Sequence, residues 1–321
     1  MLINEKKNNL GPNYASVSVI IPTKDRPDDL EVAVRSLLRQ SVLPRELIIV
    51  DQSRDTKSRQ RVEREFAGSP PQLRDHTKLV YLHDTSIRGG AIARNRAMDA
   101  AQGDLWVFLD DDVELEPDFI QELLDTYHRY PQVDGVSGII TNYPLPPWPF
   151  RILSWTFFRG PFFDERQPVY WDAEKLREQE PIRVRKFTGA VMSFRAAPIR
   201  GLRFDENLQG VSDGEDVDFC ARLRPGAVLL IAPRARLVHH QSPMGRSRTH
   251  ALRRFSRANC YLYQKHWRKG IFHRLFFMWF CVGLGLAASV ASLRRRTLDP
   301  WRALAQGMRE GTQVCKSKSD V

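Results

Sequence analysis

Three consecutive carboxylates follow a short apolar run in the stretch VFLDDDVELEP, residues 107–117. Two carboxylates about 4 Å apart repel by roughly 4 kcal/mol at an effective dielectric constant near 20, so such groups beside a buried strand take up protons or attract a cation. In an extended strand Asp110 and Asp112 point to one side and Asp111 to the other. Their hard oxygen atoms favour Mg²⁺ or Mn²⁺, ions that complete their coordination shell with phosphates and water. The triplet therefore predicts a divalent cation that holds a diphosphate; an acidic start to the helix near Pro117 is the structural alternative.

The segments around this triplet alternate β-branched runs with helical patterns, which is typical of a mostly parallel sheet with crossover helices. Strands are expected over residues 17–22, 46–51, 78–84 and 105–112, and helices over about 30–40, 57–66 and within 88–103. Ligands bind beyond the carboxyl ends of the strands in such sheets. A single Asp at such an end is commonly a turn or cap residue, but four aligned ends predict a cleft. The aspartates at these ends are Asp25, Asp51, Asp84 and Asp110 to Asp112.

The second half of the chain is less regular. Residues 142–163 are rich in Pro and aromatic side chains and resemble an interface-facing insertion more than a strand or a helix. A strand-like stretch over residues 183–197 then precedes a helix whose first turn holds Glu215 and Asp216. The insertion could serve as an acceptor lid or as a plain packed segment.

Composition excludes several classes of protein. With 321 residues, 42% hydrophobic and 27% charged, the chain is expected to fold around a substantial core. The formal net charge of +11 is uneven, since residues 233–321 hold 18 Lys and Arg against 3 acidic residues. Because this charge lies at one end and no nucleic-acid motif is interleaved with it, nucleic acid is not an expected partner. The 4 cysteines form no CxxC pair, so neither a zinc site nor a disulfide framework is indicated and a reducing compartment is expected.

The C-terminal quarter contains an uncharged apolar run over residues 275–293, LFFMWFCVGLGLAASVASL. As a helix it would be roughly 28 Å long, close to the hydrocarbon thickness of about 30 Å. Basic residues flank it on both sides and favour lipid headgroups, so we expect a membrane segment, although a buried helix of a soluble domain is the alternative. Whether the segment spans the membrane or re-enters stays open. The expected divisions are a flexible arm (1–15), a catalytic domain (16–248), a basic amphipathic juxtamembrane helix (249–270), the apolar segment (271–296) and a basic tail (297–321).

Five motifs, in order, carry a resemblance to a known family: VSVIIPTKDRP, ELIIVDQS, RGGAIARNRA, GDLWVFLDDDV and GEDVDFCARL. In this order and spacing they resemble the inverting family 2 glycosyltransferases, of the membrane-associated bacterial type. The resemblance covers about residues 16–248. It implies the GT-A fold, a Rossmann-like α/β fold of nucleotide-diphospho-sugar transferases with a mostly parallel central sheet, here followed by C-terminal membrane-associated helices.

The resemblance also implies binding residues. The nucleotide and donor would be bound by Pro22, Thr23, Asp25, Asp51, Arg94, Asp110 and Asp111. Asp112 and Asp110 would hold Mn²⁺ or Mg²⁺ together with a late histidine, for which His240 is preferred to His239.

The same resemblance assigns catalysis to the ED pair, Glu215 and Asp216, with Asp216 as general base. Inversion requires a base on the face of the sugar opposite the leaving diphosphate, and a positioned carboxylate contributes about 10²- to 10⁴-fold in rate. The implied function is transfer of a sugar from a nucleotide-sugar donor to a hydroxyl of a lipid-linked or cell-surface glycan, in cell envelope polysaccharide biosynthesis. The expected location is the cytoplasmic face of the inner membrane, at the membrane surface.

Two other functions remain as alternatives. The first is a sugar-nucleotide nucleotidyltransferase on a similar sheet, although the turn PTKDRPDD lacks the glycines that a triphosphate loop usually has. The second is a non-catalytic, basic membrane-binding protein.

Overall fold

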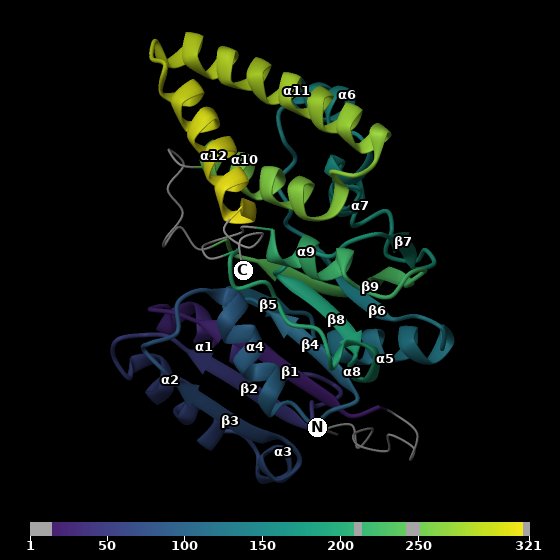
Figure 1. Ribbon diagram of the computed structural model, residues 1–321. Helices are drawn as coiled ribbons and strands as arrows, with labels where there is room; N and C mark the ends of the chain where they lie inside the picture. The colour runs from purple at the N-terminus through teal and green to yellow at the C-terminus, as the bar shows by residue number, and fades with distance from the viewer. Residues whose placement is uncertain (1–14, 209–213, 242–250, 317–321) are drawn as a thin grey trace.

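The computed structural model describes residues 15–208, 214–241 and 251–316. The expected N-terminal arm therefore lies outside the described residues except for Ala15, as does the end of the basic tail. Within the described residues the chain forms one nine-stranded sheet in the order β3-β2-β1-β4-β8-β6-β9-β5, with β7 paired to β9. Figure 1 shows this sheet below a group of C-terminal helices. The strands are β1 (Val17–Thr23), β2 (Glu46–Asp51), β3 (Lys78–His83), β4 (Leu105–Leu109), β5 (Val113–Leu115), β6 (Gly135–Ile140), β7 (Ile182–Val184), β8 (Val191–Arg195) and β9 (Leu229–His239).

The predicted direction of the sheet is confirmed. Strands β1 to β4 pair in parallel, and β6 pairs in parallel with β9. Strands β5, β7 and β8 pair antiparallel with their neighbours. The register Thr23↔Asp51 aligns the ends of β1 and β2, so the residues that follow them meet at one edge of the sheet.

The helices begin and end close to the predicted positions in the first half of the chain. In α1, Pro27 opens the helix, Asp28 and Asp29 occupy its first turn, and Leu30, Val34 and Leu37 are buried at helical spacing. The helices are α1 (Pro27–Leu37), α2 (Lys57–Ala67), α3 (Pro71–His76), α4 (Gly90–Ala100), α5 (Phe119–Arg129), α6 (Trp148–Phe157), η1 (Gly160–Phe162), α7 (Arg166–Trp171), α8 (Ala196–Ile199), α9 (Glu215–Ala221), α10 (Ala251–Leu262), η3 (Tyr263–Trp267), α11 (Ile271–Arg295) and α12 (Asp299–Lys316).

The expectation of an irregular segment over residues 142–163 is wrong, because this segment forms α6 and η1. Its prolines do not prevent a helix, since Pro149 stands in the first turn of α6, where no intrahelical N–H bond is lost. Phe158 and Phe162 pack against Phe280 of α11 with ring centroids 4.8 Å apart in each pair. Tertiary packing of the aromatic side chains therefore makes a helix where the local sequence gave no clear pattern.

Three C-terminal helices form a triangle at the end of the molecule opposite β3 (Figure 1). Helix α11 has 25 residues and contains an 18-residue stretch with a mean hydropathy of 1.9, so it is long and apolar enough to cross a membrane. Helix α12 then returns and packs along α10 through Gly307 and Gly311.

We expect Gly307→Ala to destabilise the protein. A Cβ at this position would lie 2.1 Å from Ser256 Oγ and 2.3 Å from the carbonyl oxygen of Arg253, so α10 and α12 would have to separate. Overpacking of this kind costs about 1 to 3 kcal/mol. Urea unfolding measures the change in the free energy of unfolding. The control is Gly201→Ala, where an added Cβ meets nothing within 4 Å, and equal stability of the two variants would contradict the close packing.

Candidate active site

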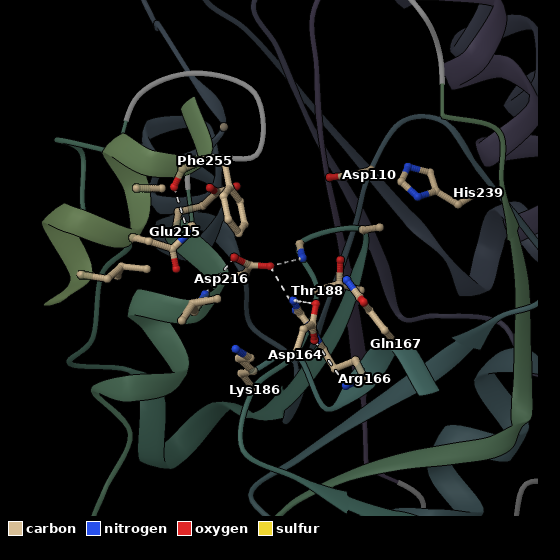
Figure 2. A pocket seen from close by; sticks show the side chains of 18 of the residues that line it. Asp110, Asp164, Arg166, Gln167, Lys186, Thr188, Glu215, Asp216, His239 and Phe255 are labelled. Atoms are coloured by element: carbon tan, nitrogen blue, oxygen red, sulfur yellow. Dashed lines mark hydrogen bonds and ion pairs between the residues drawn. The ribbon is translucent and has the colours of Figure 1, made fainter. Parts of the chain in front are cut away.

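The ends of β1 and β4 open into a cavity of about 770 Å³ that is also lined by residues of α4, α6, η1, α9 and α10. Figure 2 shows Asp110 and His239 on one side of this cavity and Glu215 and Asp216 on the other. The structure thus brings together the two acidic motifs that lie 106 positions apart in the sequence, Asp110 and Asp216. The predicted cleft at the strand ends is present.

Asp110, Asp112 and His239 form a group that could hold a metal ion. One ligand atom from each lies within 4.8 Å of the other two. The Nε2 atom of His239 lies 3.0 Å from Oδ1 of Asp112. It is buried and makes no hydrogen bond of acceptable geometry with a described residue. Two carboxylates and an imidazole whose nitrogen lacks a well-aligned partner fit a divalent cation such as Mn²⁺ or Mg²⁺.

The preference for His240 as the third ligand needs correction. Pairing of β5 with β9 aligns Val113 with His239, which places His239 beside Asp112. Adjacent residues of a strand point to opposite sides. The ring of His240 accordingly lies 3.1 Å from Glu114, and its side chain is 44% exposed. His239, and not His240, therefore has the geometry of a ligand.

Asp111 lies in the turn after β4, because this strand ends at Leu109 and does not continue to residue 112 as expected. Its carboxylate accepts hydrogen bonds from Thr23 Oγ1 at 2.7 Å and from Arg26 Nη1 at 2.9 Å. Burial raises the pKa of Asp111 to about 6, although Arg26 and Thr23 act in the opposite direction. Asp111 and Thr23 both line the cavity, so this contact joins the end of β1 to the turn after β4.

A buried guanidinium connects the two acidic motifs. Arg94 donates from Nη2 to Asp110 at 2.9 Å and from Nη1 to Glu215 at 3.1 Å. Burial opposes the charge of Arg94, but the two carboxylates outweigh it and raise the pKa of Arg94 above its usual value. Burial also raises the pKa of Glu215 to about 7, although the charge of Arg94 lowers it in part. Arg94 therefore holds α4, α9 and the turn after β4 together.

Asp216 faces the cavity with its carboxylate fixed by three donors. Oδ2 accepts from the backbone N–H of Gly189 at 2.9 Å and from Arg166 at 3.4 Å, and Oδ1 accepts from the N–H of Val217 at 2.8 Å. The side chain keeps 15% of its surface exposed. A carboxylate that is oriented in this way and still accessible can accept a proton from a bound hydroxyl.

Sequence reasoning missed three charged residues beside Asp216. Arg166 clamps Asp164 at 2.7 and 3.0 Å (Figure 2). Burial would raise the pKa of Asp164, but Arg166 outweighs it and lowers that pKa to about 2. Burial lowers the pKa of Lys186, which also lines the cavity, to about 8. The change from aromatic to charged residues in FFDERQ, residues 162–167, was a signal for Asp164 and Arg166 but not for Lys186.

The remaining predicted donor residues do not all reach the cavity. Pro22, Thr23 and Asp25 line it. Asp51 is fully buried, accepts from Tyr81 Oη at 2.6 Å and does not line the cavity, so its contact with a nucleotide stays a prediction. Asp84 accepts instead from the hydroxyl of the neighbouring Ser86 at 2.6 Å and lies outside the cavity.

Known proteins resemble this chain over much of its length. The model of Glycosyl transferase family 2 matches residues 18–198. The succinoglycan biosynthesis protein ExoM of Rhizobium meliloti is 29% identical over 235 residues, which cover 72% of this chain and 68% of ExoM. A glucosyl-dolichyl phosphate glucuronosyltransferase of Haloferax volcanii is 29% identical over 157 residues, which cover 48% of this chain and 44% of that protein. The chain thus spans less than half the length of the archaeal relative.

Solved structures share the fold. The mannosyltransferase PcManGT from Pyrobaculum calidifontis, in complex with GDP-Man and Mn²⁺, has a TM-score of 0.57 at 19% identity, with 96% of this chain and 87% of that chain covered. TarS 1-349 of S. aureus, in complex with UDP-GlcNAc, has a TM-score of 0.58 at 13% identity, with 94% and 81% covered. At these identities the likeness establishes the GT-A fold.

We expect Glu215→Gln to change how stability depends on pH. The pKa of Glu215 is about 7 in the folded protein against an ordinary value of 4.5. Between these values the folded state binds more protons than the unfolded state, so Glu215 makes the free energy of unfolding fall as pH rises. The variant lacks this contribution. Its free energy of unfolding, relative to that of the wild type, should therefore increase from about pH 4.5 to pH 7 and stay constant above pH 7.

Urea unfolding over this pH range measures the difference. Glu63→Gln is the control, since the Glu63 side chain is 51% exposed, and its curve should run parallel to that of the wild type. Parallel curves for Glu215→Gln as well would contradict the raised pKa.

Proposed function

Because the chain belongs to glycosyltransferase family 2, we propose that it transfers a sugar, with inversion, from a nucleotide-diphosphate donor to a hydroxyl of a glycan or lipid-linked acceptor. One observation carries the proposal: the Asp110–Asp112–His239 group and Asp216 line or border a single cavity. Arg94 pairs with Asp110 of this group and with Glu215, the residue before Asp216. A donor in this cavity would have its diphosphate near Asp110, Asp112 and His239 and its anomeric carbon toward Asp216. The acceptor hydroxyl would then approach between Asp216 and the sugar.

Asp110, Asp112 and His239 would hold Mn²⁺ or Mg²⁺, because their ligand atoms are close enough to share one ion. When bound, the ion supplies positive charge that stabilises the leaving diphosphate. Arg94 adds a fixed positive charge at the same wall of the cavity. In support of this, PcManGT carries GDP-Man with Mn²⁺.

The donor nucleotide would lie along the ends of β1 and β2. Pro22, Thr23 and Asp25 line this part of the cavity together with Gln52. The side chain of Gln52 accepts from the N–H of Gly89 at 2.9 Å, which fixes the entrance to α4 beside the proposed nucleotide. Asp25 has a positive φ of 53°, and its backbone N–H donates to Ser53 Oγ at 2.7 Å. The backbone at this edge of the cavity therefore has a defined shape.

Asp216 would act as the general base. Gly189 and Arg166 both donate to Oδ2 and hold the carboxylate in one orientation. Glu215, which is paired with Arg94, would help to position the donor side of the site rather than accept the proton. A base at this position contributes about 10²- to 10⁴-fold in rate.

The acceptor would be lipid-linked and the enzyme would work at the cytoplasmic face of the inner membrane. Aromatic residues in or directly after α6, in η1 and in α10 line the cavity and suit an apolar substrate portion. They are Phe150, Phe158, Phe162 and Phe255. Two relatives support a glycan or lipid-linked acceptor, since one is a glucosyl-dolichyl phosphate glucuronosyltransferase and the other belongs to succinoglycan biosynthesis.

We expect Mn²⁺ with GDP or UDP to raise the melting temperature of the wild-type protein by about 5 °C at about a hundredfold excess over the dissociation constant. His239→Gln and Asp112→Asn should each lose the metal-dependent part of this shift. The matched control is His240→Gln, which should keep it because His240 faces Glu114. Loss of the shift in His240→Gln with retention in His239→Gln would reverse the assignment of the ligand.

For Asp216→Asn we expect donor binding, measured as the same melting shift, to be retained while transfer falls by about 10²- to 10⁴-fold. The measurement is release of nucleoside diphosphate from a panel of nucleotide sugars in the presence of membrane extract. Asp84→Asn is the control, since Asp84 lies outside the cavity. Transfer at a near wild-type rate in Asp216→Asn would remove Asp216 as the base.

A further inference from the structure

The exposed large apolar side chains of the described residues gather in two parts of the chain, residues 145–155 and 255–301. On α11 they form a stripe along the whole helix, at spacings of three or four residues. The stripe consists of Ile271, Phe272, Leu275, Met278, Trp279, Val282, Leu286, Val290 and Leu293. On or just before α6 the exposed residues are Leu145, Trp148, Phe150, Ile152 and Trp155.

The opposite face of α11 is packed on protein. Phe280, Leu284 and Ala288 are buried in a cluster with residues of α6, η1 and α12. A Cβ at Gly283 would lie 2.4 Å from the Cβ of Phe157, so α6 and α11 approach closely. Trp279 Nε1 donates to the carbonyl of Thr156 at 2.8 Å and joins the same two helices. Helices α6 and α11 therefore lie side by side (Figure 1), and both carry exposed apolar side chains.

Both ends of α11 return to the same side of the molecule. Before α11, Lys265 pairs with Asp205 at 2.5 Å and with Asp218 at 2.6 Å, which ties η3 to the catalytic domain. After α11, Glu310 of α12 pairs with Arg253 of α10 at 2.5 Å. If α11 crossed a bilayer, α10 and α12 would be separated by about 30 Å of hydrocarbon, whereas here they are in contact.

We propose that α6 and α11 form a platform that enters one leaflet of an anionic lipid bilayer and that α11 does not cross it. Exposed basic residues stand at both ends of α11 and would meet lipid headgroups of the same leaflet. They are Arg268, Lys269 and Arg274 before or within its first turn and Arg294, Arg295 and Arg296 at its end. Basic residues near an anionic surface are attracted to it and strengthen binding. A helix that is apolar on one face and packed on protein on the other binds in the plane of the interface.

Labelling of introduced cysteines in sealed membrane vesicles tests the topology. The full chain carries Cys281→Ser and Cys315→Ser, while Cys220 and Cys260 are buried. Gln313→Cys reports on α12 and Thr85→Cys on the catalytic domain, and both positions are exposed. In vesicles where Thr85→Cys reacts with a membrane-impermeant maleimide without detergent, Gln313→Cys should react equally. Reaction of Gln313→Cys only after detergent would show that α11 spans and would overturn the proposal.

Flotation with vesicles of phosphatidylglycerol and phosphatidylethanolamine tests the role of α6. Trp155→Glu on α6 and Leu286→Glu on α11 should each reduce partitioning by about tenfold, because each puts a charge in the apolar face. Thr85→Glu is the control with the same added charge. Unchanged flotation of Trp155→Glu would remove α6 from the platform, and release of the wild type by a high-salt wash would show that no apolar face is inserted.

Discussion

The buried ion pairs of Arg94 are the interactions on which the rest of the site depends. Its guanidinium pairs with Asp110, from the end of β4, and with Glu215, from the start of α9. Removal of one partner from a buried ion pair typically costs about 3 to 5 kcal/mol, because the other charge stays buried without compensation. The pairs therefore fix the distance between the part of the cavity that would hold a diphosphate and the part that holds Asp216. The glycine that begins α4 allows this, since a Cβ at Gly90 would lie only 3.1 Å from Arg94 Nη1.

Helices from the second half of the chain complete the cavity. Aromatic residues in or next to α6, η1 and α10 form one wall of the cavity, and Phe158 and Phe162 of this wall also pack against Phe280 of α11. Arg166, which follows η1, reaches Asp216 from this part of the chain. The proposed catalytic centre and the apolar platform are thus built from shared elements, and a displacement of α6 would change both.

The sequence predicted the parts of the site that depend on the sheet. Parallel strands end at a common edge, so Thr23, Asp110 and Asp112 could be assigned to one cleft before their contacts were known. The choice between His239 and His240 depends on the register of β9 against β5, and one residue of register reverses the side to which each ring points. Arg166 and Lys186 were missed because long-range packing of the aromatic segment brings them to Asp216. Packing of α12 on α10, which decides how α11 can meet a membrane, depends likewise on Gly307 and Gly311 rather than on a hydrophobic pattern.

The central claim is that acidic side chains at neighbouring strand ends and the proposed base, Asp216, serve one donor. Anomalous diffraction from crystals of the full chain grown with Mn²⁺ and a nucleoside diphosphate tests it most directly. The account predicts one manganese peak in contact with Asp112 and His239, with the outer phosphate of the diphosphate directed toward the Asp216 side of the cavity. A manganese ion bound elsewhere, or a diphosphate directed away from Asp216, would contradict it.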